Sequence, residues 1–380
     1  MNKSRIIILT SAHRHPDPRI FYKQAVSLAK HFEVCLYTQS DEKSGKYQNV
    51  NITALSASRT LPARIRRVFQ LFWVGLTVRG DLVLFHDPEL VIPMVIVKVL
   101  TDRKIIWDIH EDYGKVAYSR IWIPLGLRNL IACFIRYIEK ISAYFFDGFM
   151  VVIDSFIKKV GKKPFEVIYN YPRIEGIQLQ RRDNKILGLL YVGDITENRG
   201  AFRLLKLAIA LLNKNCDFKM YLIGPVPHNY IRKRVDDVIN KHKLENQVIK
   251  LGQLSLQDIN KYARRCQFGL IPNIEDERYE ESLPTKMFEY MMFGLTVISS
   301  RIDRWSKIIE KNNCGFTVDW ENISSIADRV INQFETKLFK RFGSNGKKVV
   351  KNYYSWEMEE MKLLNFFNSL IGDNYKTNYS

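Results

Sequence analysis

Short apolar runs that alternate with longer amphipathic segments are the feature that most constrains the fold of this 380-residue chain. A run of roughly four to eight apolar residues is typical of a parallel strand that is buried on both faces. Helical spacing between such runs supplies the crossovers that parallel strands need. The pattern predicts an α/β protein with a doubly wound sheet. In the first half, the predicted strands are residues 5–10, 33–38, 50–54, 81–85, 104–109, 148–152 and 165–169.

A second series of the same kind follows, with predicted strands at residues 187–192, 218–223, 248–251, 268–271, 295–299 and 315–318. The segment 170–184 between the two series contains proline, glycine and mixed charge, which is typical of an interdomain linker. A length of 380 residues also suits two domains. The predicted organisation is a first domain over residues 1–170, a linker over 171–186, a second domain over 187–352, and a terminal helix with a frayed tail over 353–380.

The charge of the chain is strongly positive. A formal net charge of +18 favours an anionic partner, which is a nucleic acid, an anionic lipid surface or a phosphorylated substrate. Residues 43–80 and 113–138 hold seven and four Lys or Arg residues and no acidic residue. Ile65 and Phe69 fall at helical spacing beside Arg64. A basic amphipathic helix of this kind can lie on an anionic membrane, or it can pack on the protein core and expose its basic side to solvent. Two such stretches in the first half of the chain favour the membrane.

Other features of the sequence concern location. No apolar run reaches the roughly 18 residues of a membrane span, and the first apolar run predicts a buried strand rather than a signal peptide. The five cysteines are scattered and lack metal-binding spacing, which indicates reduced thiols. No nucleic-acid-binding module is apparent. We therefore expect a cytoplasmic protein that associates peripherally with the inner face of the cell membrane and has no nucleic-acid partner.

Residues suited to ligand binding follow several predicted strands. Three strands of the second series end at glycine, which lets a backbone approach a ligand closely; these are Gly193, Gly224 and Gly252. Three of the seven histidines lie at strand ends in the first series: His13, His86 and His110. Ligands of α/β proteins bind at this edge of the sheet. Taken singly, each of these glycines is explained by an ordinary turn, and each of these histidines by a structural role.

The stretch from Glu281 to Glu289 carries the most chemical information. Its two carboxylates flank Pro284 and Lys286, and Pro284 suits the start of a helix that we predict over residues 285–293. The free amides of the first turn, together with the lysine charge, form an anion site. Carboxylates accept hydrogen bonds from neighbouring hydroxyls. The stretch therefore predicts a ligand that carries both phosphate and sugar hydroxyls.

Several enzyme classes are disfavoured because their motifs are missing. No Gly-x-Gly-x-x-Gly follows the first strand, as in a dinucleotide-binding enzyme, and no Gly-x4-Gly-Lys-Ser/Thr indicates a P-loop. The chain also lacks a Gly-x-Ser-x-Gly nucleophile elbow and any His or Cys cluster with metal-ligand spacing.

The stretch from Glu281 to Glu289, with the strand-like residues that follow it, resembles the donor motif of retaining GT-B glycosyltransferases of family 4, the group 1 type. Residues 86–90 (His-Asp-Pro-Glu-Leu), 108–113 (Asp-Ile-His-Glu-Asp-Tyr) and 191–200 resemble the same family, and the resemblance covers most of the chain. It implies two Rossmann-like doubly wound parallel-sheet domains that face each other across a cleft. It also implies that domain closure brings their halves together and that the C-terminal helix returns to the first domain.

The chain departs from the family pattern at identifiable positions. Asp194 stands where the family has an arginine, and Arg199 stands where it has a lysine. An early Gly-Gly loop is replaced around Ala12 and His13. One cation for a diphosphate is thereby lost, so Arg199 and Lys286 are expected to carry more of that role.

The resemblance implies a metal-independent transfer, with retention, of a hexosyl group from a UDP- or GDP-linked sugar to a lipid-linked or oligosaccharide acceptor in cell-surface polysaccharide synthesis. No cofactor is expected, and the absence of Asp-x-Asp disfavours the metal-dependent enzymes of the other common glycosyltransferase fold. Glu289 would hold the ribose, Glu281 the donor sugar, and His110 the acceptor. The expected catalytic residues are His110 and Glu281. The expected donor-binding residues are Gly193, Arg199, Gly224, Ser282, Leu283, Thr285, Lys286 and Glu289. The expected acceptor-side residues are His13, Arg19, His86 and Asp87, and no metal site is expected.

Alternative functions remain open at this stage. A sugar-nucleotide epimerase of the same fold would bind a donor without an acceptor groove, and the basic helices of the first half argue against it. A non-catalytic partner subunit is suggested by Asp194. A nucleic-acid binder is suggested by the charge alone.

Overall fold

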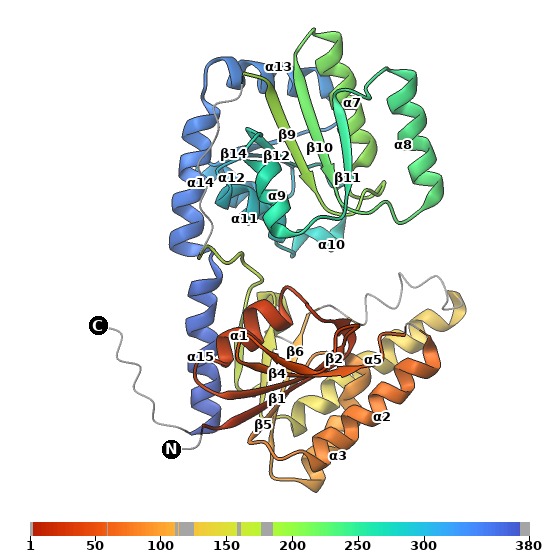
Figure 1. Cartoon of the computed structure of the whole chain (residues 1–380), viewed down its shortest axis with the longest axis vertical. Coiled ribbons are helices and arrows are strands. Elements are labelled where there is room, and N and C mark those ends of the chain that lie inside the picture. The colour runs from red at the N-terminus through yellow and green to blue at the C-terminus, as the bar shows by residue number, and fades with distance from the viewer. Residues whose placement is uncertain are drawn as a thin grey trace. The chain divides into compact units, whose positions relative to one another are not determined.

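The structure is a computed structural model that describes residues 3–58, 60–110, 113, 125–157, 161–175 and 185–372. The chain divides into two compact units, one formed by Met1–Asn170 with Trp356–Ser380 and the other by Tyr171–Ser355 (Figure 1). Most of the expected linker (residues 176–184) and the expected tail (residues 373–380) lie outside the described residues. The same holds for residues 111–112 and 114–124, which belong to the predicted motif at 108–113 and to the second acid-free stretch.

The first unit contains an eight-stranded sheet in the order β3-β4-β2-β1-β5-β6-β7-β8. All neighbouring strands are parallel except β3, which pairs with β4 in the antiparallel sense. The sequence analysis missed β3, which spans only three residues. The strands are β1 (Arg5–Arg14), β2 (Glu33–Gln39), β3 (Gly45–Tyr47), β4 (Val50–Leu55), β5 (Leu82–Phe85), β6 (Lys104–Ile109), β7 (Gly148–Val151) and β8 (Phe165–Val167).

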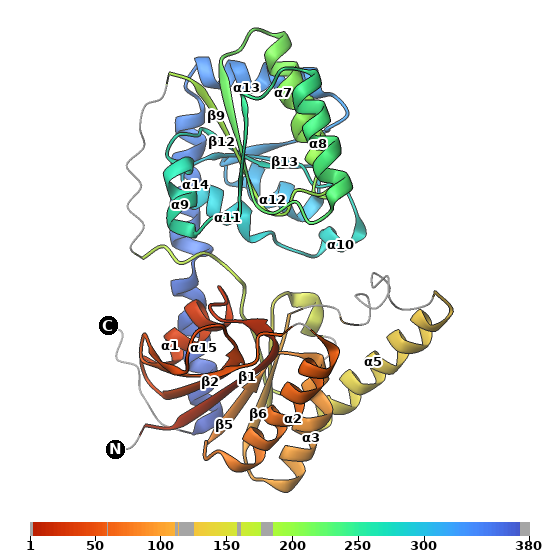
Figure 2. The same cartoon turned by 45° about the vertical axis from the view of Figure 1, so that its right-hand side comes forward.

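Helices cover both faces of this sheet, as the continuous apolar strands require. One face packs on η1 (Ile20–Ala25), α1 (Val26–Leu28) and α15 (Trp356–Ile371). The indole Nε1 of Trp356 donates to the Ser27 hydroxyl at 2.9 Å, so the C-terminal helix is anchored in the first unit. The opposite face packs on α2 (Leu61–Thr77), η2 (Pro88–Leu90), α3 (Val91–Leu100) and α5 (Leu125–Phe145), as Figure 2 shows. The short η3 (Asp154–Phe156) follows β7.

The second unit contains a six-stranded sheet in the order β11-β10-β9-β12-β13-β14, and every neighbouring pair is parallel. The order reverses beside β9, so β9 lies at the point where α/β sheets of this kind bind ligands. The strands are β9 (Leu187–Val192), β10 (Phe218–Ile223), β11 (Val248–Gly252), β12 (Phe268–Ile271), β13 (Thr296–Ser300) and β14 (Gly315–Val318).

The helices of the second unit form a layer on each side of its sheet (Figure 1). The core on one side includes α7 (Ala201–Asn213), α8 (Asn229–Lys241) and α13 (Ile323–Glu335). The other helices are α9 (Leu256–Ala263), α10 (Glu277–Glu280), α11 (Thr285–Met292), α12 (Asp303–Lys311) and α14 (Phe339–Tyr353). Among the described residues, no helix is long and apolar enough to cross a membrane.

Candidate functional site

Two glycines form the floor of a candidate site in the second unit, where β9 and β10 end. Gly193 and Gly224 have φ angles of 137° and 143°, which residues with a side chain rarely adopt. A Cβ atom on Gly224 would lie 2.1 Å from the carbonyl oxygen of Gly193, so only glycine fits there. The amide of Gly193 donates to Ile223 at 2.8 Å, and that of Gly224 to Gly252 at 2.7 Å. The two strand ends are thus fixed at close approach.

Two cations converge above this floor. A Cβ atom on Gly193 would lie 3.3 Å from Nη1 of Arg199 and 3.3 Å from Nζ of Lys286. The Lys286 ammonium also lies 4.6 Å from the centre of the Tyr191 ring. The space that a side chain at position 193 would fill is therefore bounded by two positive charges, as an anionic ligand requires.

The ammonium group of Lys286 lacks a hydrogen-bond partner in the described part of the chain. Its Nζ atom is withdrawn from solvent and has no hydrogen-bond partner among the described residues. Burial and, to a smaller extent, the neighbouring Arg199 lower the pKa of Lys286 to about 7, although Glu289 and Asp194 act in the opposite direction. An unpaired buried ammonium is costly unless a ligand supplies the counter-charge. This lysine therefore has the properties of an anion-binding residue.

Asp194 neutralises part of the positive charge of Arg199. The guanidinium Nη2 of Arg199 lies 3.5 Å from Oδ2 of Asp194, and both side chains are about two-fifths exposed, at 40% and 45%. The Tyr191 hydroxyl donates to the Asp194 carbonyl at 2.8 Å, and burial raises the pKa of this tyrosine. The position at which the chain departs from the family pattern is therefore in direct contact with the candidate site.

Helix α11 carries Lys286 and is fixed rigidly to the sheet. Its N-cap is Pro284 in an extended conformation, one residue before the predicted helical position. The buried hydroxyl of Tyr290 accepts the amide hydrogen of Val192 at 2.8 Å, which ties α11 to β9. Phe288 packs edge-to-face against Tyr171 and at a tilt against Tyr354, with ring centres 4.7 and 4.9 Å away. A rigid helix places Lys286 reproducibly above the glycines.

The remaining predicted donor residues lie in the loop before α11 and on α11 itself, which carries Thr285 and Glu289. Glu281 is exposed, whereas Ser282, Leu283, Thr285 and Glu289 are partly buried. The loop is held by α12, because Arg304 donates to the Glu281 carbonyl at 2.5 Å and the buried Trp305 indole donates to the Ser282 carbonyl at 2.7 Å. The polar side chains of the loop therefore stand on a fixed backbone.

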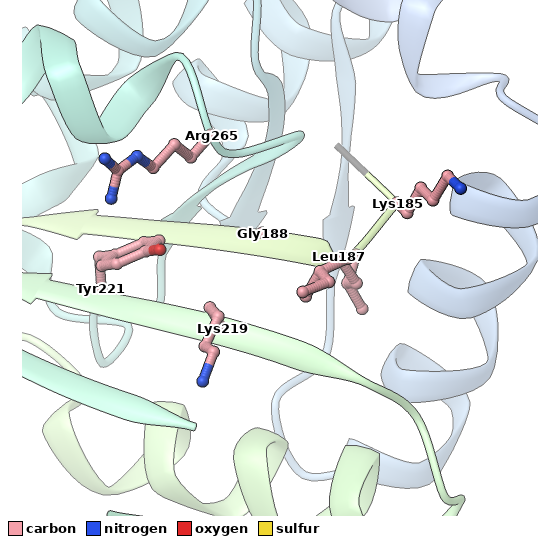
Figure 3. A pocket seen from close by; sticks show the side chains of 7 residues that line it. Lys185, Leu187, Gly188, Lys219, Tyr221 and Arg265 are labelled. Carbon is pink, nitrogen blue, oxygen red and sulfur yellow. The ribbon is translucent and has the colours of Figure 1, made fainter. Parts of the chain in front are cut away.

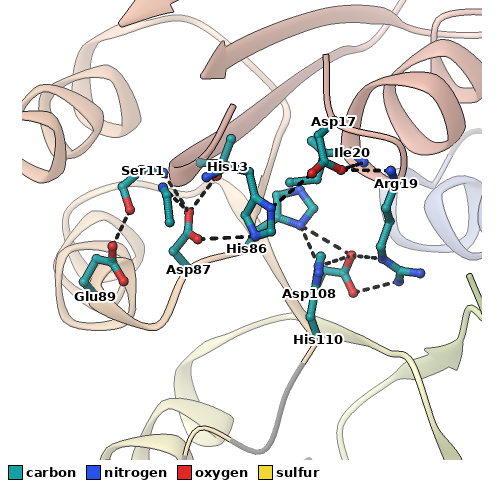
Figure 4. Close-up of polar contacts among 12 residues, drawn as sticks. Ser11, His13, Asp17, Arg19, Ile20, His86, Asp87, Glu89, Asp108 and His110 are labelled. Atoms are coloured by element: carbon teal, nitrogen blue, oxygen red, sulfur yellow. Dashed lines mark hydrogen bonds and ion pairs between the residues drawn. The ribbon is translucent and has the colours of Figure 1, made fainter. Parts of the chain in front are cut away.

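Asp108 is the centre of a polar network in the first unit, at the end of β6 (Figure 4). Its carboxylate accepts from Nη2 of Arg19 at 3.1 Å, from the Gln24 amide at 2.5 Å, and from Nε2 of His110 at 2.8 Å. Nδ1 of His86 lies 3.4 Å away. Nε2 of His110 also lies 3.0 Å from Nδ1 of His86. We assign the proton of neutral His110 to Nε2, beside the carboxylate, which leaves Nδ1 of that histidine unprotonated.

The charges in this network are strongly perturbed by burial. Burial alone would raise the pKa of the fully buried Asp108 carboxyl, but Arg19 and His110 hold it well below its usual range. Burial also lowers the pKa of His86, so this histidine is neutral. Arg19, His86 and Asp87 are 6%, 1% and 3% exposed, whereas the side chain of His110 is 14% exposed and that of His13 is 37% exposed. Of the predicted acceptor-side residues, His13 is thus the one most open to a ligand.

A second carboxylate, Asp87, joins the ends of β1 and β5. Its Oδ2 atom accepts from the Thr10 hydroxyl at 2.8 Å and from the Ser11 amide at 2.7 Å, and its Oδ1 atom lies 3.7 Å from Nε2 of His13. Nδ1 of His13 lies 3.2 Å from Asp17. Burial alone would lower the pKa of His13, but the two carboxylates raise it. In turn, burial would raise the pKa of Asp17, but His13 and two backbone amides lower it to about 2.

The network also has the spacing of a metal site. The ligand atoms of His86, Asp108 and His110 lie within 4.8 Å of one another. However, the carboxylate oxygens of Asp108 already accept hydrogen bonds from Arg19 and Gln24, and a metal ion would lie close to the buried guanidinium. These contacts fit a hydrogen-bonded network better than a metal centre, and the absence of a metal remains a prediction.

Some site residues were not identified from the sequence. Asp108, Gln24 and Asp17 in the first unit, and Tyr191 and Tyr290 in the second, had no assigned role. For Asp108 a signal exists, because it lies two residues before His110 and so shares its side of the strand. For Gln24, no local pattern indicates a contact that spans 84 positions in the sequence.

A basic pocket lies at the opposite end of the second sheet, where β9 and β10 begin (Figure 3). Its volume is about 380 Å³, and it is lined by Lys185, Ile186, Leu187, Gly188, Lys219, Tyr221 and Arg265. Lys219 already donates to the Asn246 carbonyl at 2.5 Å. None of the predicted site residues contributes to this pocket.

Several solved structures share the architecture of this chain. Sucrose-phosphate synthase from Thermosynechococcus elongatus matches with a TM-score of 0.74 and 14% identity, over 97% of this chain and 100% of that one. HepE from Anabaena, solved with UDP-glucose, has a TM-score of 0.69 and 13% identity, over 96% and 100%. WaaG, a glycosyltransferase involved in lipopolysaccharide biosynthesis, has a TM-score of 0.68 and 14% identity, over 95% and 99%. At these identities the likeness shows the fold.

Sequence comparison locates the family in the second unit. Residues 187–335, from the start of β9 to the end of α13, match the family of group 1 glycosyl transferases. No curated protein sequence matches the chain significantly. The matched segment contains both glycines, both cations and both glutamates of the candidate site. The chain therefore has the GT-B fold that its motifs imply, and its residues 187–335 match the family of group 1 glycosyl transferases.

Proposed function

We propose that the protein is a retaining glycosyltransferase that uses a nucleotide-diphosphate sugar as donor. The observation that carries the proposal is the buried ammonium of Lys286, which has no hydrogen-bond partner among the described residues and lies with Arg199 above Gly193. A diphosphate supplies the missing negative charge. The donor is UDP- or GDP-linked, and the UDP-glucose bound by HepE supports the uridine form.

The donor chemistry follows from the charges in the second unit. As the sugar leaves, negative charge develops on the diphosphate, where Lys286, Arg199 and the first amides of α11 stabilise it without a metal ion. Glu289 accepts hydrogen bonds from the ribose hydroxyls, and the exposed Glu281 accepts them from the donor sugar. Ser282 and Leu283 form the loop before α11, and Thr285 begins the helix.

The first unit binds the acceptor. Asp108 accepts the Nε2 proton of His110, so Nδ1 of His110 is the atom that can accept a hydrogen bond from an acceptor hydroxyl. The departing phosphate assists removal of the acceptor proton, and the anomeric configuration is retained. Arg19, His86 and Asp87 act through the network because they are buried, whereas His13 is exposed enough to touch the acceptor.

The acceptor is a lipid-linked or oligosaccharide intermediate of cell-surface polysaccharide synthesis. The involvement of WaaG in lipopolysaccharide biosynthesis supports this class. The protein works in the cytoplasm at the inner face of the cell membrane, to which its net charge of +18 attracts it.

A thermal-shift screen with UDP, GDP and a panel of sugar nucleotides tests donor binding, because a ligand that binds only the folded state raises the melting temperature. We expect one nucleotide class to stabilise the wild type and Lys286→Met to lose that stabilisation. Lys307→Met is the matched control, because Lys307 is an exposed lysine on α12 that pairs with Asp303. An equal shift in Lys286→Met and the wild type would remove Lys286 from the site.

Turnover separates the transferase from its alternatives. An enzyme of the proposed kind releases nucleotide faster when a lipid-linked or saccharide acceptor is present, and Glu281→Ala abolishes that release. An epimerase would interconvert the donor sugar without an acceptor. A fully active Glu281→Ala variant would contradict the role given to this carboxylate.

The contact between Asp194 and Arg199 favours a second candidate, a non-catalytic GT-B partner that binds a donor weakly. Asp194→Asn frees Arg199, so it should tighten UDP binding several-fold in either case. If turnover is absent in the wild type and in this variant with every acceptor tested, the non-catalytic function is the better one.

A further inference from the structure

Helix α2 has two apolar faces rather than one. Its inner face packs on the sheet through Val68, Leu71 and Phe72. A second stripe with a spacing of four residues points outward, and its side chains are 70%, 50%, 62% and 60% exposed: Leu61, Ile65, Phe69 and Trp73. The inner face supplies the contacts with the core, whereas the described residues of the first unit leave the outward stripe exposed to solvent.

The neighbouring helices repeat this arrangement. On α3, four apolar side chains are 54%, 42%, 66% and 65% exposed: Ile92, Ile96, Val99 and Leu100. On α5, seven are between 37% and 74% exposed: Leu127, Leu130, Phe134, Tyr137, Ile141, Tyr144 and Phe145. Single exposed apolar residues are ordinary, but three helices with the same outward stripe are not.

These stripes belong to one surface. Helices α2, α3 and α5 cover the same face of the first sheet, and α3 contacts both of the others. Both views show the three helices together on one side of this sheet (Figures 1 and 2). The corresponding layer of the second unit, formed by α7, α8 and α13, differs: among its described residues Tyr230 is the one large apolar side chain that is exposed. We call the outer surface of α2, α3 and α5 the apolar face.

The charges on these helices identify what the apolar face binds. The helices carry seven Lys or Arg residues, of which Arg67 is buried and Arg64 and Lys98 pair with Glu89 and Asp147. Their one acidic residue, Glu139, is buried. Arg66, Arg136 and Lys140 are exposed beside the apolar stripes. Trp73, Tyr137 and Tyr144 are of the residue types that prefer the boundary between lipid headgroups and acyl chains. Apolar side chains surrounded by cations match the surface of a bilayer that contains anionic lipid.

We propose that the apolar face of α2, α3 and α5 inserts into the headgroup region of an anionic membrane. This inference deepens the proposed function, because it assigns the membrane contact to a defined surface of the unit that binds the acceptor. The aliphatic and aromatic side chains supply insertion, and the cations supply the preference for anionic lipid. No part of the donor site takes part.

Vesicle flotation of the full chain tests the proposal. We expect binding to vesicles with about 30% phosphatidylglycerol in phosphatidylcholine and little binding to phosphatidylcholine alone. Raising the salt to about 0.5 M should weaken the binding without abolishing it, because ionic strength screens the charges but leaves insertion intact. Equal binding to both vesicle types, or no binding to either at low salt, would overturn the proposal.

A double variant, Phe69→Ser with Trp73→Ser, tests the surface itself. It should bind anionic vesicles at least about tenfold more weakly, because the transfer of two large apolar side chains from water into the bilayer no longer contributes to binding. The matched control is Tyr230→Ser with Leu256→Ser, two side chains of the second unit with 59% and 49% exposure, and its binding should be unchanged. Equal losses in both double variants would contradict the assignment.

Two further measurements distinguish loss of membrane binding from loss of the fold or of donor binding, and from self-association of the chain. The UDP-induced thermal shift should persist in the Phe69→Ser, Trp73→Ser variant, so that loss of vesicle binding is distinguished from loss of the donor site or of the fold. Sedimentation velocity reports whether a second copy covers the apolar face instead. A wild-type dimer that becomes a monomer in this variant, with vesicle binding unchanged, would overturn the proposal in favour of self-association.

Discussion

Lys286 has its Nζ atom withdrawn from solvent, and its pKa is lowered to about 7. Above this pH the lysine of the folded protein is largely neutral, although a lysine in an unfolded chain stays charged up to about 10.4. A diphosphate favours the charged form, so binding above pH 7 takes up a proton. The affinity for UDP should therefore fall between pH 7 and pH 9, by up to about tenfold per pH unit.

Isothermal titration in two buffers with different ionisation heats counts the proton that accompanies UDP binding. Lys286→Met should bind UDP more weakly and should lose the dependence on pH. The unliganded variant should also be more stable than the wild type near pH 6, since the cost of charging Lys286 is present below its folded pKa and disappears toward pH 10. A wild-type affinity that does not change between pH 7 and pH 9 would contradict this account.

Gly224 is the residue on which the floor of the donor site depends. A methyl group there would collide with the Gly193 carbonyl at 2.1 Å, and the φ angle of 143° is strained for any other residue. Gly224→Ala should cost about 1–3 kcal/mol of stability and weaken UDP binding, because Gly193 must move. Chemical denaturation and the UDP thermal shift measure the two effects.

Gly252 provides the control for this prediction. It also follows a strand and has a positive φ angle of 66°, but a Cβ atom there would meet nothing within 4 Å. Gly252→Ala should therefore cost less stability and should leave UDP binding intact. Similar effects of the two substitutions would indicate that backbone strain, rather than the contact with Gly193, is responsible.

At the scale of the element, β6 delivers a carboxylate and a histidine to one side of the sheet. Asp108 accepts the Nε2 proton of His110 at 2.8 Å, which makes Asp108 a positioning residue. Asp108→Asn should lower kcat by about 10²-fold and leave the KM for the donor nearly unchanged, because the wrong tautomer of His110 would face the acceptor. Steady-state kinetics below the melting temperature of the variant provides the measurement.

The matched comparison for Asp108 is His110→Gln, which removes the group that Asp108 orients. If the two act together, the double variant should be no slower than His110→Gln alone. The donor-induced thermal shift should persist in all three variants, because the donor residues lie in the second unit. Loss of donor binding in Asp108→Asn would indicate a general structural role instead.

The elements differ in how far the sequence determines them. The bounds of strands such as β9 and β12 were predicted within one residue, because a continuous apolar run is typical of a strand in a sheet that helices cover on both faces. β3 was missed, since its three residues form an edge hairpin with little apolar pattern. Ile65 and Phe69 of α2 were predicted to share the apolar side of a helix, but spacing alone does not show which side the sheet will cover, and both are exposed.

The residues of the candidate sites also differ in how far the sequence indicates them. Local chemistry indicates the glycines, Lys286 and the two glutamates as candidate ligand-binding residues, through turns after strands, a helix start and paired carboxylates, and their binding roles stay predictions. The contact between Arg19 and Asp108 spans 89 positions, and the pairing of Asp194 with Arg199 depends on how one loop folds back. Such contacts are decided by tertiary structure, which no short motif records.

At the scale of the whole molecule, the order of residues along the chain differs from their grouping in space. Trp356 follows α14 of the second unit directly, yet it is fully buried in the core of the first unit and donates to Ser27. Trp356→Ala should cost about 3–5 kcal/mol, because it leaves a large cavity beneath the first sheet. The loss should be confined to the unit in which the indole packs.

Hydrogen exchange read by mass spectrometry distinguishes the two units in the Trp356→Ala variant. Amides of β1 and β2 should exchange faster, whereas those of α14 and β9, in the second unit, should keep their wild-type rates. Tyr353→Ala, three positions earlier and 67% exposed, should change neither set. Faster exchange in β9 would mean that the units do not unfold independently. Unchanged exchange in β1 would mean that the first unit does not depend on its C-terminal helix.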